Sequence, residues 1–120
     1  MAKISDKIRR RIFERDGGRC PHCGETEAIG LQHRISKGMG GSKLLDTPAN
    51  LLTFCNIGNA GMESDPELAE KARRNGWKLS RWEDPANVPF YDTNTGRWWL
   101  TDSDYGRQIF LGGDAPYGTK

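Results

Sequence analysis

The 120-residue sequence lacks the features that would place it in a membrane or in an oxidising compartment. No apolar stretch approaches the roughly 18 residues of a membrane-spanning helix, and no cationic and then apolar leader is present. Cysteine is scarce. The chain has only three cysteines, an odd number that cannot pair completely within one molecule. We therefore expect a soluble, cytoplasmic protein with no membrane partner, whose cysteines are thiolates and not disulfides.

Apolar residues are also few. They make up 35% of the chain, and the mean hydropathy is −0.76, which is low for a domain of this length. Composition does not change abruptly along the chain, so we expect one domain over residues 1–112 and a loose tail over 113–120. The core is expected at about 17–76 and a hairpin at about 86–112. A bound metal is the first candidate for additional stability.

Positive charge is concentrated in the first part of the chain. The net charge is +2, but residues 1–43 hold ten Lys or Arg and five Asp or Glu, whereas residues 44–120 hold eight and eleven. A positive end is typical of a protein that contacts a phosphate backbone, and a solvated cationic face explains the same pattern. The candidate DNA-binding residues are Arg9, Arg10, Arg11, Arg34, Lys37 and Lys43.

An N-terminal helix is predicted from Ser5 to Arg15. Ser5 is a favourable N-cap, and isoleucines at 4, 8 and 12 would share one face of the helix. Gly17-Gly18 would end it. The arginines of this helix then lie on its remaining faces, either along a nucleic acid or in solvent.

A cysteine knuckle and two strands are predicted next. Residues 20–24 have the C-x2-C spacing of a tight knuckle, and 29–35 alternate as a strand with a Gln-His pair near its end. A second strand, 51–54, is followed directly by Cys55. The glycine-rich segment 38–42 between the strands allows close approach of the backbone to a ligand, and a simple long connection remains the alternative.

The C-terminal half is predicted to hold a helix and a hairpin. The helix begins at Ser64-Asp65-Pro66-Glu67, which has capping-box spacing and a proline in the first turn, and it stops after Arg74 at Asn75-Gly76. Residues 88–91 and 97–101 would form the hairpin. Four tryptophans are expected to pack the helix against this hairpin, with base stacking as the alternative for one of them: Trp77, Trp82, Trp98 and Trp99.

The order of these motifs resembles that of the HNH endonucleases, particularly the small ones of actinobacterial phages. The similarity covers roughly residues 10–100, and the matching segments are CPHCG (20–24), LQHRISKGMGGS (31–42), TPANLLTFC (47–55) and KARRNGWKLSRWEDPANVP (71–89). The resemblance implies an α+β fold with a ββα-metal core, two strands and a helix around one metal ion. To this core the sequence adds the N-terminal helix, the knuckle, and the C-terminal helix and hairpin.

The resemblance also implies a reaction, the metal-dependent hydrolysis of DNA phosphodiester bonds to 5′-phosphate and 3′-hydroxyl ends. His33 matches the general base, a role that suits a side chain able to accept a proton near neutral pH. Asn50 matches the middle asparagine, whose amide fixes the loop between the strands. A structural histidine and an ordinary turn asparagine are the alternatives.

Two positions depart from the family pattern. The residue before the histidine, usually a metal ligand, is Gln32, and the last motif position, nine after Asn50 and usually histidine, is Asn59. Both are neutral amides, which bind a hard divalent ion such as Mg²⁺ or Mn²⁺ more weakly than a carboxylate does. Glu63 would share a helix face with Asn59 if a helix already runs there, and would then supply the charge.

The structural zinc that the family often carries is also incomplete. Cys20, Cys23 and Cys55 match three of its four cysteines, and Gly58 stands at the fourth place. His22 lies inside the knuckle and is not expected to turn onto the same ion. A water or an acidic side chain would then fill the gap, or the three thiols simply pack as small hydrophobes.

Three functions remain open from the sequence. The first is an active DNA endonuclease, which the retained His33 and Asn50 favour. The second is a catalytically silent HNH module that binds DNA or a phage protein such as the packaging terminase, which the amides at 32 and 59 favour. The third is a zinc-knuckle interaction protein. If the chain is phage-encoded, it would act in the cytoplasm of the host cell.

Overall fold

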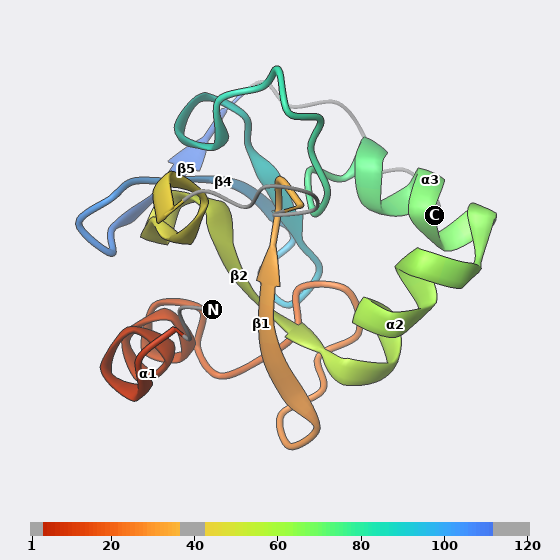
Figure 1. The fold of residues 1–120 in the computed structure, drawn as a ribbon, viewed down its shortest axis with the longest axis horizontal. Coiled ribbons are helices and arrows are strands. Elements are labelled where there is room, and N and C mark those ends of the chain that lie inside the picture. Colours follow the sequence, from red (N-terminus) through yellow and green to blue (C-terminus); the bar gives the residue numbers. More distant parts are fainter. Residues whose placement is uncertain (1–3, 37–42, 112–120) are drawn as a thin grey trace.

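The structure, a computed structural model, describes residues 4–36 and 43–111. They form an α+β fold of helices and two small antiparallel sheets, as expected (Figure 1). The expected tail at 113–120 and the glycine-rich segment 38–42 lie outside the described residues. Within the described part, no helix has the length and apolar character needed to cross a membrane. The elements, with η for 3₁₀ helices, are α1 (Asp6–Arg15), β1 (Ile29–His33), η1 (Lys43–Asp46), η2 (Pro48–Asn50), β2 (Leu51–Cys55), α2 (Asn56–Ser64), α3 (Pro66–Arg74), η3 (Pro85–Asn87), β3 (Phe90–Asp92), β4 (Arg97–Thr101) and β5 (Arg107–Phe110).

Helix α1 forms where its capping residues predict. The Ser5 hydroxyl accepts a hydrogen bond from the Ile8 N–H at 3.2 Å, and the helix ends at Asp16, before two glycines with positive φ. Ile12 is its fully buried residue. The helix therefore packs through the predicted isoleucine face. Arg10 and Arg11 are exposed on other faces, whereas the Arg15 side chain is buried and donates to the carbonyls of Pro48 and Leu51.

Strands β1 and β2 form an antiparallel pair at the centre of the molecule (Figure 1). The register places Ile29 opposite Cys55 and His33 opposite Leu51. All five residues of β2 are buried, as expected for a strand covered on both faces. β1 ends at His33, two residues before the predicted end, because Ile35 leaves β2 and forms an isolated bridge with Leu79.

Helices α2 and α3 follow β2 without a loop between β2 and α2. α2 continues through Gly58 and Gly61. Asn59 and Glu63 therefore lie on one helix, which was the condition for Glu63 to lie beside Asn59. α3 starts as predicted, but its N-cap is Asp65 and not Ser64, since the Asp65 carboxylate accepts a hydrogen bond from the Glu67 N–H at 3.0 Å. Gly76 ends α3 with φ 77°, and a Cβ there would lie 2.1 Å from the Pro89 carbonyl oxygen.

The predicted hairpin is part of a larger sheet. β3 and β4 pair as expected, and β5 adds a third strand on the far side of β4. Trp77 is fully buried and donates from Nε1 to the Tyr91 carbonyl at 2.7 Å, which joins the end of α3 to β3. Trp82 is 86% exposed, so the expectation that all four tryptophans pack there is wrong for it.

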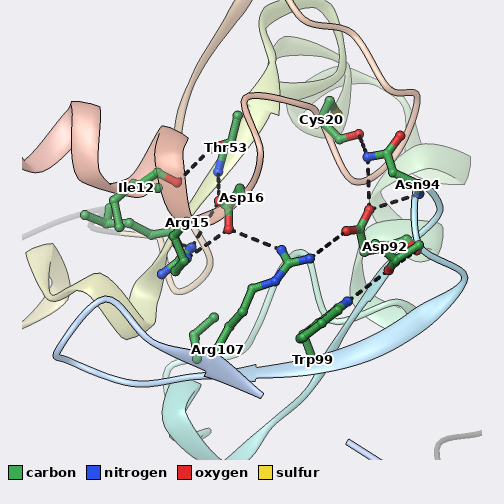
Figure 2. Close-up of polar contacts among 12 residues, drawn as sticks. Ile12, Arg15, Asp16, Cys20, Thr53, Asp92, Asn94, Trp99 and Arg107 are labelled. Atoms are coloured by element: carbon green, nitrogen blue, oxygen red, sulfur yellow. Dashed lines mark hydrogen bonds and ion pairs between the residues drawn. The ribbon is translucent and has the colours of Figure 1, made fainter. Parts of the chain in front are cut away.

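A buried charge network anchors β5 to the rest of the fold (Figure 2). Arg107 Nη2 lies 3.1 Å from Asp92 Oδ2, and its Nη1 lies 3.6 Å from Asp16 Oδ1. The Arg107 guanidinium also lies 4.0 Å from the centroid of the Trp99 ring. Asp16 is paired with Arg15 at 2.9 Å. These contacts hold together three segments that are far apart in the sequence.

Candidate functional site

Most of the predicted catalytic residues line one cleft. It has a volume of about 260 Å³ and lies where the end of β1 meets α2 and the segment after α3. We call it the β1–α2 cleft; its lining residues are Leu31, Gln32, His33, Ser36, Asn59, Met62, Glu63 and Lys78. The sequence predicted Gln32, His33, Asn59 and Glu63, and β1 and α2 bring them together.

His33 has a carboxylate partner that the sequence did not indicate. Its Nε2 lies 2.7 Å from Asp46 Oδ1, and the two side chains are 23% and 19% exposed. A neutral histidine that donates from Nε2 keeps Nδ1 as an acceptor. Asp46 stands in η1, thirteen residues later, so no local spacing rule connects it with His33.

Asn50 holds the two ends of the segment between β1 and β2 together. It is fully buried, and its Oδ1 accepts a hydrogen bond from the Ile35 N–H at 2.7 Å. Its Nδ2 donates to the carbonyls of Ile35 at 3.1 Å and Leu45 at 2.8 Å. This pattern matches the loop-fixing contacts that the sequence predicted. Asn50 does not line the cleft, so it can act only by positioning its neighbours.

Gln32 presents an amide with one end satisfied and one end free. Its Nε2 donates to the Trp77 carbonyl, whereas its Oε1 is buried and has no hydrogen-bond partner. Buried polar atoms nearly always have a partner, and one without a partner costs on the order of 1–3 kcal/mol. Gln32 Oε1 is therefore a candidate ligand atom for a donor group or a cation.

Helix α2 and the segment after α3 complete the cleft. Asn59 Nδ2 donates to the Leu31 carbonyl at 3.4 Å, which fixes α2 against β1. Glu63 is on the same face one turn later, and its Oε2 lies 3.9 Å from Lys78 Nζ. Lys78 and Ser36 were not predicted. Lys78 follows α3, so only the folded chain brings it to β1. The cleft thus combines amide and carboxylate oxygens with one cation.

A second group of functional side chains lies at the knuckle. The sulfurs of Cys20, Cys23 and Cys55 and a ring nitrogen of His22 all lie within 4.8 Å of one another. This group can hold a metal ion. His22 was not expected to turn onto the same ion, but a ring nitrogen of His22 lies close to the three sulfurs, and its ring packs against the Trp77 ring at 5.1 Å.

Burial shifts the pKa values of three side chains in this cluster. Desolvation raises the pKa of the Cys20 thiol to about 12, although backbone N–H groups oppose that rise. Desolvation also raises the pKa of Cys55 and lowers the pKa of His22, whose ring is further disfavoured as a cation by Lys71. Cys20 and Cys55 are therefore expected to be neutral thiols, and His22 a neutral imidazole, at neutral pH when no ion is bound.

The predicted DNA-binding residues are not all available. Arg34 is fully buried, and its guanidinium donates to backbone carbonyls, so its prediction as a DNA contact is wrong. Arg10 and Arg11 are exposed and Arg9 is half-exposed, although Arg11 lies 3.9 Å from the centroid of the Tyr105 ring. Helix α1 and helix α2 lie on opposite sides of the β1–β2 pair in Figure 1. The α1 arginines are thus remote from α2.

The structure does not test whether the two lysines beside the glycine-rich segment contact DNA. Lys37 lies outside the described residues, and only the backbone of Lys43 is described, at the start of η1.

Comparisons with protein-family models, with curated proteins and with solved structures found no match. The choice of a function therefore depends on the chain's own residues.

Proposed function

We propose that the protein is a metal-dependent endonuclease of the HNH type that hydrolyses DNA phosphodiester bonds. The observation that carries this proposal is the placement of His33 in a cleft with Gln32, Asn59 and Glu63, the residues that the HNH motif order selects. The segment order β1–β2–α2 supports the proposal, because a ββα-metal core has two strands followed by a helix.

His33 is proposed to act as the general base. With Asp46 at Nε2, the neutral ring has Nδ1 as its acceptor, and Nδ1 takes the proton of the attacking water. The resulting imidazolium is stabilised by the Asp46 carboxylate, in the same way that a buried aspartate orients and stabilises histidine in hydrolases. Asp46 is thus a positioning residue, since it acts on the phosphate only through His33.

The cleft offers hard oxygen atoms that fit a divalent cation. Gln32 Oε1 has no other partner, and the Glu63 carboxylate supplies the charge that two amides lack. A bound Mg²⁺ or Mn²⁺ would polarise the scissile phosphate. Lys78, the cation that lines the cleft, is placed to contact a phosphate oxygen. A structural zinc at the cysteine cluster is proposed as the second metal.

One observation favours a second function. Glu63 is paired with Lys78, which partly neutralises the carboxylate on which cation binding would depend. A protein with this cleft but too little cation affinity would be a silent module that binds DNA or a phage packaging protein such as the terminase.

Cleavage of supercoiled plasmid separates the two functions. The purified protein is incubated with plasmid and Mg²⁺, Mn²⁺ or EDTA. Nicked or linear product with a divalent ion, and none with EDTA, supports the nuclease. A folded protein that retards DNA in a gel but cuts with neither ion supports the silent module.

Replacing Asp46 with asparagine is expected to slow cleavage by about 10–100-fold, the usual cost of losing a carboxylate that orients a functional histidine. Asparagine keeps an acceptor for Nε2 but not the charge that stabilises imidazolium. The loss should therefore appear in the single-turnover rate constant, while DNA binding in a gel stays at the wild-type level. Asp104→Asn, an exposed carboxylate outside the cleft, is the control. A wild-type rate constant in Asp46→Asn would exclude the role of Asp46.

Replacing Gln32 with aspartate is expected to tighten Mg²⁺ or Mn²⁺ roughly tenfold, because a charged oxygen takes the place of a neutral one. The shorter side chain also withdraws from the Trp77 carbonyl, which a longer carboxylate would repel. Gln32→Asn is the matched control, since it has the same length and no charge. The metal concentration for half-maximal cleavage is the measurement. Equal values for the two variants would show that position 32 does not contact the ion.

A further inference from the structure

The knuckle cluster contains one ligand more than the three cysteines. A structural zinc generally has four protein ligands in a tetrahedron, with Zn–S distances of roughly 2.3 Å and Zn–N distances of roughly 2.0 Å. Ligand atoms around one zinc then lie roughly 3.4–3.8 Å apart. The four atoms here lie within 4.8 Å of one another, so small side-chain rotations close the tetrahedron. We propose that His22 is the fourth ligand of a Cys₃His zinc site, with its ring nitrogen Nδ1 on the ion.

The environment of His22 supports this assignment. Its ring stacks on Phe54, with centroids 6.0 Å apart and planes 7° apart, and packs against Trp77. These contacts fix the ring against Phe54 and Trp77, although the side chain as a whole is only half-buried. His22 Nδ1 is buried and has no hydrogen-bond partner. A polar atom held in this way needs a partner, and the three nearby sulfurs identify that partner as a soft-ligand metal ion such as Zn²⁺.

The sulfurs are also arranged as metal ligands. The His22 N–H donates to Cys20 Sγ at 3.4 Å, and the Gly58 N–H donates to Cys55 Sγ at 3.1 Å. Such donors stabilise the thiolate form that binds metal. Cys55 is moreover the N-cap of α2, where the positive end of the helix favours an anion.

No other described residue competes for the fourth position. A side chain at Gly58, where the fourth cysteine would stand, would place its Cβ 2.8 Å from Cys55 Sγ. Two carboxylates, Glu25 and Asp65, lie beside the cluster, but neither belongs to it. Glu25 accepts hydrogen bonds from the backbone at 3.0 and 3.2 Å, and Asp65 caps α3. Among the described residues, His22 is the one that supplies a fourth ligand atom within 4.8 Å of the three sulfurs.

The site would fix the knuckle to the corner between β2 and α2. Cys20, His22 and Cys23 come from the knuckle and Cys55 from the end of β2, so one ion joins segments separated by more than thirty residues in sequence. Helix α2, which carries Asn59 and Glu63, begins at this corner. The zinc proposal does not depend on nuclease activity, because its ligands are distinct from the cleft residues.

Metal analysis and cobalt spectroscopy on the purified full chain test the proposal. We expect one zinc per chain and, after exchange with Co²⁺, the visible d–d bands of a tetrahedral site with three sulfurs and one nitrogen. His22→Cys should keep the metal and shift the bands toward those of a four-sulfur site. His22→Phe keeps the ring that stacks on Phe54 and Trp77 but has no nitrogen. It should weaken zinc on the order of 100-fold in a competition with a chelating dye.

The outcomes are distinct. Loss of zinc affinity in His22→Phe together with the band shift in His22→Cys supports the proposal. Wild-type affinity and an unchanged cobalt spectrum in both variants would show that His22 is not a ligand. A wild-type chain that takes up neither zinc nor cobalt would overturn the whole site. None of these readings uses DNA cleavage, so failure of the nuclease proposal leaves the test intact.

Discussion

Replacing His33 with alanine is expected to lower DNA cleavage by about 10²–10⁴-fold, the usual contribution of a positioned general base. The reason is the loss of Nδ1, the acceptor that Asp46 leaves free by contacting Nε2. The side chain is partly exposed at the edge of the cleft, so the variant should fold as the wild type does. Single-turnover cleavage of plasmid with saturating metal measures the chemical step.

Two controls make this result decisive. Ser36→Ala changes a polar residue of the same cleft to which we assign no proton transfer, and it should cut within a few-fold of wild type. Gel retardation should show that His33→Ala still binds DNA. If His33→Ala cut as fast as Ser36→Ala, the assignment of the base would be wrong, even if the protein remained a nuclease.

The fold was predictable where the rules are local. Ser5 and Asp65 cap helices because a short polar side chain reaches backbone N–H groups two or three residues away, and that spacing is visible in the sequence. β5 was missed because three of its four residues are polar or exposed and no apolar alternation marks it. What holds it is Arg107, whose partners at 16 and 92 only the folded chain brings near.

The residues of the candidate site were also predictable where a local motif marks them, and not where distant segments meet. The motif order selected the cleft residues of β1 and α2, but not Asp46 or Lys78, which reach the cleft from other segments. His22 was discounted because it lies inside the knuckle, between two cysteines whose sulfurs already converge on the ion. In the structure a ring nitrogen of His22 lies within 4.8 Å of the sulfurs, and the ring contacts Phe54 and Trp77, neither of them adjacent in sequence.

Arg34 shows how charge alone misleads. The sequence grouped it with the basic residues that would meet DNA, but it is the second largest fully buried side chain among the described residues. Its Nε donates to the Gly76 carbonyl at 2.9 Å, and its two Nη atoms donate to Pro85 at 2.8 Å and Val88 at 2.6 Å. Desolvation lowers the pKa of Arg34 to about 9, which still leaves it cationic at neutral pH. The charged guanidinium thus binds backbone carbonyls of the segments that follow α3.

Replacing Arg34 with methionine is therefore expected to destabilise the fold by about 3–5 kcal/mol, because three carbonyls lose a charged donor inside the protein. Because the variant no longer buries a cation, the desolvation cost of the guanidinium disappears. This reduces the loss of stability but does not remove it. Arg34→Lys should recover little, because one ammonium group cannot replace the planar fork that reaches separate carbonyls. Chemical denaturation of each variant, at constant metal content, gives the free energy of unfolding.

Arg10→Met is the matched control for Arg34→Met. It removes an exposed arginine from α1 and should change stability by less than about 0.5 kcal/mol, while weakening DNA binding if α1 meets phosphates. The two variants thus separate the two uses of arginine in this chain. If Arg34→Met kept wild-type stability and lost DNA affinity in a salt-dependent way, Arg34 would be a DNA contact after all, and its buried position would be wrong.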